Sequence, residues 1–118
     1  MFKKGDILEA DKRKFHQGRH MILIWGEYRN EYDFEGLMLT HSDRYPDNVL
    51  LDKTHVSNDH EFRWENTHFV NQLFIKLSDW GPFEKVGEIT ESGMSFIEEK
   101  LTNTEATYYM DYIKHYVK

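Results

Sequence analysis

The side chains best suited to chemistry gather near the start of the chain, where His16 and His20 flank Arg19. A histidine titrates close to neutral pH, so it can accept or donate a proton. An arginine is permanently charged, and its planar guanidinium binds two phosphate oxygens at once. Together these residue types suit acid–base chemistry at a phosphate group. The alternative is a surface loop that happens to hold one arginine and two unrelated histidines.

The charge of this segment differs from that of the rest of the chain. Residues 1–20 hold six Lys or Arg and three Asp or Glu, and this balance of +3 within a total of −6 leaves −9 for the other 98 residues. An acidic protein does not suggest general nucleic-acid binding, which usually requires a basic surface. A local basic cluster that includes Lys12, Arg13 and Lys14 could still receive a phosphate backbone. A solvated charged loop explains the same charges equally well.

A second polar cluster, Thr40-His41-Ser42, follows an apolar segment. Short hydroxyl side chains bind phosphate oxygens, and His41 between them is a further candidate for proton transfer or binding. The alternative interpretation is structural: Thr40 ends a strand and Ser42 lies in the following turn.

The remaining histidines do not predict a metal centre. His55, Asp59, His60 and His68 lie near one another in sequence, but the spacing of the histidines matches no metal-binding motif. A strand or turn would also point these side chains in different directions. The chain has no cysteine, which excludes thiolate ligands and disulfides. We therefore expect no metal and no cofactor.

The elements that must position these residues are mostly strands. A chain of 118 residues has room for one domain. Short apolar or alternating segments separated by turn residues predict strands, while polar segments 11–18 and 26–33 predict loops. We expect strands near residues 7–10, 20–25, 34–40, 49–51, 62–65, 69–77 and 83–89.

Helix is expected only at the end of the chain. Thr90 suits the N-cap of a helix over 91–101, in which Met94, Ile97 and Leu101 recur at helical spacing. A second helical stretch is predicted over 105–117, with tyrosines on one face. Residues 1–118 therefore form one mainly β domain, with a small antiparallel barrel or sandwich of five to seven strands over 1–90 and a C-terminal helical segment over 91–118.

The order of four short segments resembles that of the MazF/PemK (Kid/MazF) toxins, which are small SH3-like antiparallel barrels. The segments are Lys4-Gly5-Asp6-Ile7, Gly18-Arg19-His20 before an apolar strand, Leu37-Met38-Leu39-Thr40-His41-Ser42, and residues 66–77 followed by Lys85-Val86-Gly87-Glu88-Ile89-Thr90 before a helix. His20 stands where the family usually has proline, and the chain continues beyond the usual C-terminal helix.

This resemblance implies an endoribonuclease of a toxin–antitoxin pair that cleaves single-stranded RNA without a metal. The 2′-hydroxyl attacks the neighbouring phosphorus and leaves a 2′,3′-cyclic phosphate. The implied catalytic residues are Arg19, Thr40, His16 and His20, and the implied RNA-binding residues are Ser42, His41, Lys12, Arg13 and Lys14. The implied partners are RNA, a cognate antitoxin and a second copy of the chain.

The second hypothesis is an SH3-like barrel without catalytic activity that binds a protein or a nucleic acid. Under either hypothesis we expect a cytoplasmic protein with no membrane partner. No long apolar stretch resembles a signal peptide or a membrane span.

Overall fold

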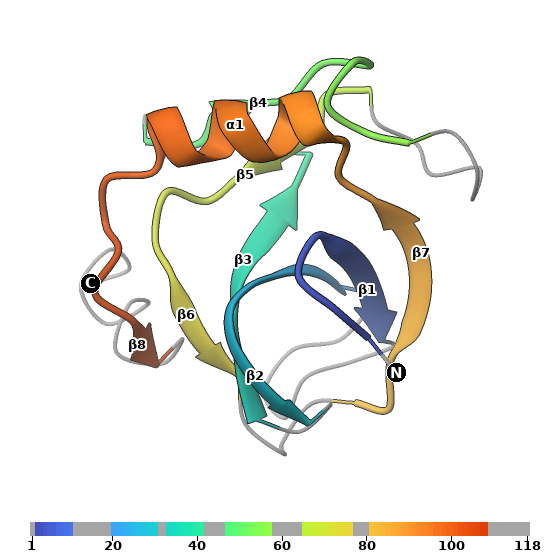
Figure 1. Cartoon of the computed structure of the whole chain (residues 1–118), viewed down its shortest axis with the longest axis vertical. Coiled ribbons are helices and arrows are strands. Elements are labelled where there is room, and N and C mark those ends of the chain that lie inside the picture. The colour runs from blue at the N-terminus through green and yellow to red at the C-terminus, as the bar shows by residue number, and fades with distance from the viewer. Residues whose placement is uncertain are drawn as a thin grey trace.

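The computed structural model describes residues 2–10, 20–30, 33–41, 47–57, 65–76 and 81–108. The described residues are mainly β, and the first of the two predicted helices follows residue 90 (Figure 1). In chain order the elements are β1 (Asp6–Ala10), β2 (His20–Asn30), β3 (Asp33–Thr40), β4 (Val49–Leu50), β5 (His68–Phe69), β6 (Phe74–Lys76), β7 (Glu84–Glu88), α1 (Glu91–Lys100) and β8 (Thr107–Tyr108).

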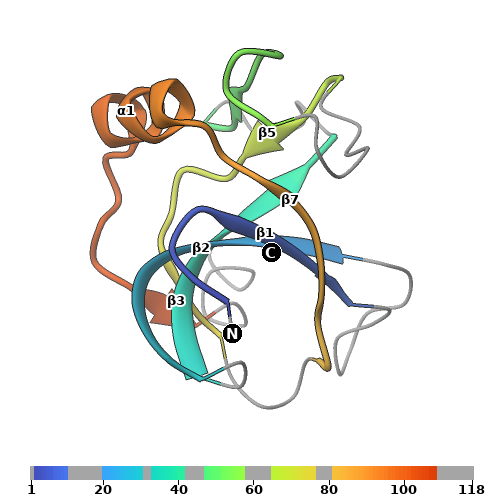
Figure 2. The ribbon, with the colours of Figure 1, turned by 45° about the vertical axis from the view of Figure 1, so that its right-hand side comes forward.

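The strands form one mainly antiparallel sheet in the order β4-β5-β3-β2-β1-β7. The long strand β3 pairs with β5 near its end and with β6 near its start. Figure 2 shows how strongly β2 and β3 curve. Strand pairing leaves the sheet open, but a bridge between Val56 and Ile89 joins the segment after β4 to the end of β7. The Ser57 N–H donates to the Glu88 carbonyl at 2.9 Å beside this bridge.

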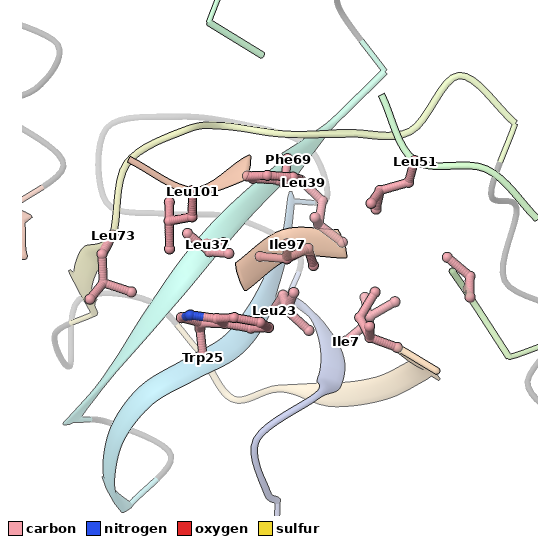
Figure 3. Close-up of a cluster of buried hydrophobic side chains, with 12 residues drawn as sticks. Ile7, Leu23, Trp25, Leu37, Leu39, Leu51, Phe69, Leu73, Ile97 and Leu101 are labelled. Carbon is pink, nitrogen blue, oxygen red and sulfur yellow. The ribbon is translucent and has the colours of Figure 1, made fainter. Parts of the chain in front are cut away.

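Apolar side chains cover both faces of the central strands. Four consecutive residues of β2, 22–25, are buried, as expected for a strand covered on both sides. On one face the main cluster lies between the sheet and α1 (Figure 3) and consists of Ile7, Leu23, Trp25, Leu37, Leu39, Leu51, Val56, Phe69, Leu73, Ile89, Ile97 and Leu101. The second cluster consists of Leu8, Ala10, Ile22, Ile24, Phe34, Met38, Phe74 and Phe83.

The helix α1 begins and ends where its sequence predicts. The Thr90 hydroxyl accepts a hydrogen bond from the Gly93 N–H at 3.1 Å, so it caps the first turn. Ile97 is fully buried in the main cluster, and Leu101 follows it one turn later. The helix is thereby held against the sheet by its apolar side. No helix in the described part of the chain is long and apolar enough to cross a membrane.

The predicted loop over 26–33 is wrong, because β2 continues to Asn30. The Tyr28 ring packs against Phe34 of β3 with 5.7 Å between ring centroids. Arg29 forms an exposed ion pair with Asp33 at 3.2 Å. The contact between Tyr28 and Phe34 and the ion pair between Arg29 and Asp33 therefore help to extend the hairpin through mostly polar residues.

Two further predicted elements, the strand over 69–77 and the helix over 105–117, differ from the structure because of contacts between residues distant in sequence. The strand expected over 69–77 is interrupted between β5 and β6. At this break the side chains of Asn71 and Gln72 form hydrogen bonds with the backbone of residues 100–105. The helix expected over 105–117 does not begin at 105, since β8 pairs in parallel with β6, with Tyr108 beside Ile75. The rest of that predicted helix, residues 109–118, lies outside the described residues.

Candidate functional site

Five strands place one residue each in a continuous line across one end of the sheet. Ala10 of β1 pairs with His20 of β2. Met21 pairs with Leu39, so the same register brings the backbone of His20 beside Thr40, one residue further along. Thr40 pairs with His68 of β5, and His68 pairs with Leu50 of β4. We call this line the cross-strand row and define it as Ala10, His20, Thr40, His68 and Leu50.

The cross-strand row lies on the face of the sheet opposite to α1. Leu39 and Phe69 are a direct pair, and both belong to the cluster that contacts the helix. Because successive strand residues point to opposite faces, the adjacent pair Thr40 and His68 points away from the helix. Ala10 agrees with this assignment, since it belongs to the second cluster.

Exposure increases along the row from β1 to β4. Ala10 is buried, Thr40 and His68 are half-buried, and Leu50 is 54% exposed. The polar members therefore lie between a buried and an exposed apolar residue, where a ligand on the surface can contact them.

A hydrogen bond to the backbone orients the imidazole of His68. Its Nδ1 lies 2.9 Å from the Asn66 carbonyl oxygen, two residues earlier in the chain. Asn66 has a φ of 58°, in the left-handed region that asparagine tolerates better than most residues. This turn directs the Asn66 carbonyl at the imidazole.

The structure brings some of the predicted site residues together and leaves others outside its described part. Thr40 and the backbone of His20 belong to the row, and His41 follows Thr40 as an exposed residue. His16, Arg19, Ser42 and the basic residues Lys12, Arg13 and Lys14 lie outside the described residues. The segment 11–19 nevertheless starts after Ala10 and ends before His20, so both of its anchors are members of the row.

A second polar cluster joins β1 to β7 away from the row. The Lys85 Nζ lies 3.1 Å from Asp6 Oδ1 and 2.5 Å from Glu88 Oε1, and the Asp6 side chain is 2% exposed. The Lys3 N–H donates to Asp6 Oδ2 at 3.0 Å. The hydrogen bond to Glu88, followed by the ion pair with Asp6, raises the pKa of Lys85. These contacts tie the start of one strand to its neighbour, which is a structural role.

His55 also has a structural role, because it docks a loop on α1. Its ring stacks on Phe96 with 4.2 Å between centroids, and its Nδ1 accepts from the Asp52 N–H at 3.0 Å. The Thr54 hydroxyl and N–H both bond to Asp52 Oδ1, which lowers the pKa of that carboxyl. Among the residues that the structure describes, no three His, Asp or Glu side chains gather closely enough to hold a metal ion.

Sequence reasoning missed His68 as a member of the site. The predicted strand began one residue later, and His68 was weighed only as a metal ligand. Its pairing with Thr40 spans 28 positions of the chain, so only the register of the folded sheet reveals it.

No family model matches the chain, and no curated protein sequence matches it significantly.

Proposed function

We propose that this chain is a MazF/PemK-like endoribonuclease built on a small SH3-like barrel. The strong curvature of β2 and β3 and the bridge between Val56 and Ile89 favour a barrel, because the bridge links the two edge regions of the sheet (Figure 2). The seven strands before residue 90 pair only in antiparallel fashion within the described part of the chain. A barrel of this kind presents its strand-end residues at a surface that can bind RNA.

The observation that carries the proposal is the position of Thr40 in the cross-strand row. The segment that contains His16 and Arg19 leaves the sheet at Ala10 and returns at His20, and both of these residues share the row with Thr40. Arg19 directly precedes His20 in the chain, so chain connectivity links it to a member of the row. Resemblance and register therefore favour the same end of the molecule.

In the proposed reaction the ribose 2′-oxygen attacks the adjacent phosphorus. Arg19 stabilises the phosphorane, since a guanidinium binds two equatorial oxygens at once. The Thr40 hydroxyl donates to a phosphate oxygen, while Ser42, His41 and the basic residues 12–14 bind the RNA. His16 or His20 transfers a proton.

The proposed partners follow from the same assignment. We propose a cytoplasmic homodimer that binds single-stranded RNA and is inhibited by an antitoxin protein. Two large apolar residues of the described chain, Leu50 at 54% and Tyr108 at 46% exposure, are available for contacts between proteins.

The test is cleavage of a single-stranded RNA by the purified protein in EDTA, with the 3′ ends of the products identified by mass spectrometry. We expect 2′,3′-cyclic phosphate ends. Arg19→Ala should lower the single-turnover rate by about two to three powers of ten, because it removes a donor to transition-state charge. Arg19→Lys should restore little of this rate, since lysine lacks the planar fork.

Arg29→Ala is the matched control. Arg29 is exposed near the far end of β2, at the opposite end of the strand from His20. This variant should keep the wild-type rate. A wild-type protein that cleaves no RNA, or an Arg19→Ala variant that keeps its full rate, would refute the proposal.

A further inference from the structure

We infer that His68 is the general base that removes the proton from the attacking 2′-hydroxyl. This inference rests on the proposed endoribonuclease function and adds to it a catalytic role for His68, a residue to which the resemblance assigns no role. It follows from three observations: the hydrogen bond at Nδ1 of His68, its place beside Thr40 and its partial exposure.

The hydrogen bond at Nδ1 determines the tautomer of His68. A carbonyl oxygen can only accept, so at 2.9 Å from the Asn66 oxygen the Nδ1 atom must carry the proton. In the neutral imidazole the lone pair then lies on Nε2, which is the atom that a base needs. Within the described part of the chain, Nε2 makes no hydrogen bond.

The pairing of β3 with β5 places this base at the proposed phosphate site. Residues directly opposite on antiparallel strands have Cβ atoms about 4.5–5.5 Å apart and point to the same face. A phosphate that accepts a hydrogen bond from Thr40 is therefore within reach of the His68 imidazole. On the other side of His68 stands Leu50, an apolar residue that contributes no competing charge.

The Asn66 turn keeps the imidazole in this orientation. The acceptor is a backbone carbonyl, and the left-handed conformation of Asn66 fixes its direction. A base whose second nitrogen is held in this way loses little orientational freedom when substrate binds. The arrangement resembles in principle the way that an active-site histidine is oriented by an acceptor at Nδ1.

The proposed step balances as follows. Nε2 of neutral His68 takes the proton of the 2′-hydroxyl, and the bond between O2′ and phosphorus forms. The bond between phosphorus and O5′ breaks. O5′ takes a proton from the imidazolium of His16 or His20, so one histidine gains a proton and another loses one. The products are a 2′,3′-cyclic phosphate and a 5′-hydroxyl.

The experiment compares single-turnover cleavage of one RNA by the wild-type protein and His68→Ala between pH 5 and 9, with circular dichroism to verify folding. We expect a rate loss of about 10²–10⁴-fold, the usual contribution of a general base. The wild-type rate should fall on the acid side as the base becomes protonated, and His68→Ala should lose this acid limb. Added imidazole should restore part of the variant's rate, which it would not do for a structural role.

A second measurement reads the tautomer without any activity. Two-bond ¹⁵N–¹H correlation spectra of the free protein should show the neutral imidazole of His68 protonated at Nδ1, whereas protonation at Nε2 would overturn the assignment. If the wild-type protein cleaves and folded His68→Ala keeps its rate within about threefold, the role of His68 is refuted and the proposed function stands. If the wild-type protein cleaves no RNA, the proposed function fails and His68 has no such role.

Discussion

The two faces of the sheet near residues 39–40 and 68–69 are built in different ways. On one face Leu39 and Phe69 pack against α1, whose first turn is tied to a neighbouring loop. There the Thr90 and Ser92 hydroxyls both donate to the Thr54 carbonyl, at 2.6 and 2.8 Å. On the opposite face Thr40 and His68 stand side by side and partly exposed. One register step therefore separates an apolar pair that packs against the helix from a half-buried polar pair on the other face.

This difference indicates how function can be added to such a small sheet. Every hydroxyl that caps or docks α1 is committed to a structural hydrogen bond. Thr40 and His68 of the cross-strand row are half-buried polar residues at strand ends. Substitutions on the helix face should therefore change stability, whereas substitutions of Thr40 and His68 should change activity.

The largest stability effect is expected from Ile97→Ala. Ile97 is fully buried at the centre of the cluster between α1 and the sheet (Figure 3), so its truncation removes transfer free energy and leaves a cavity. The free energy of unfolding should fall by about 2–5 kcal/mol. Urea denaturation measures this change, and Glu98→Ala on the exposed side of the same helix should stay within about 0.5 kcal/mol of wild type.

Gly93→Ala should have the next largest effect. A Cβ atom at this position would lie 2.3 Å from the His55 carbonyl oxygen and 2.6 Å from Ile89 Cγ2. The backbone carbonyl cannot move without breaking its bond from the Thr90 N–H. We expect a loss of about 1–3 kcal/mol, read as a lower urea midpoint with the same slope.

If the folded fraction of Gly93→Ala also cleaved RNA much more slowly than wild type, the separation of the two faces would be wrong. Ser95→Ala provides the control, because Ser95 is exposed on the same helix. It should leave both the midpoint and the rate unchanged.

The ion cluster of Lys85 predicts a smaller, pH-dependent effect. Folding raises the pKa of Lys85 above its usual value of 10.5, chiefly through its hydrogen bond to Glu88. A raised pKa means that the folded state holds this proton more tightly, so the contribution is complete below about pH 10.5 and is lost as the pH rises through the folded pKa. Thermal unfolding from pH 8 to 11 should show this decline.

Lys85→Met should be less stable than wild type at pH 8, because Asp6 remains buried without its cation. Its stability should also lack the Lys85 component of the alkaline decline. Equal pH slopes in the two proteins would show that another group causes that decline.

The sequence predicted the elements that local pattern determines. The structure confirms the strands β1 and β3 and the helix α1. Each is indicated by a pattern within a few residues: apolar residues in the two strands, and the N-cap Thr90 with the spacing of Ile97 and Leu101 in the helix. The continuation of β2 past Gly26 was missed because it depends on Tyr28 meeting Phe34 across the hairpin.

The break after β5 and the strand β8 depend on partners about 30 residues away, as when Gln72 donates to the Glu105 carbonyl. The site shows the same limit. Thr40 could be selected from its neighbours in sequence, whereas His68 required the register of two strands that are distant in the chain. Local patterns report burial and turns, but they do not specify which strands pair.

The most direct test of the two-face account replaces one threonine on each face by valine, which keeps the shape and removes the hydroxyl. Thr40 stands in the cross-strand row, and Thr90 caps α1. The measurement is the single-turnover RNA cleavage rate per folded molecule, with the unfolding free energy of each variant determined in parallel.

We expect Thr40→Val to lower the rate by about tenfold, the equivalent of one hydrogen bond of roughly 1.4 kcal/mol. Thr90→Val should keep the wild-type rate and lose about 0.5–2 kcal/mol of stability. A Thr40→Val variant with the full rate, or a Thr90→Val variant whose folded molecules are as slow as Thr40→Val, would contradict the account.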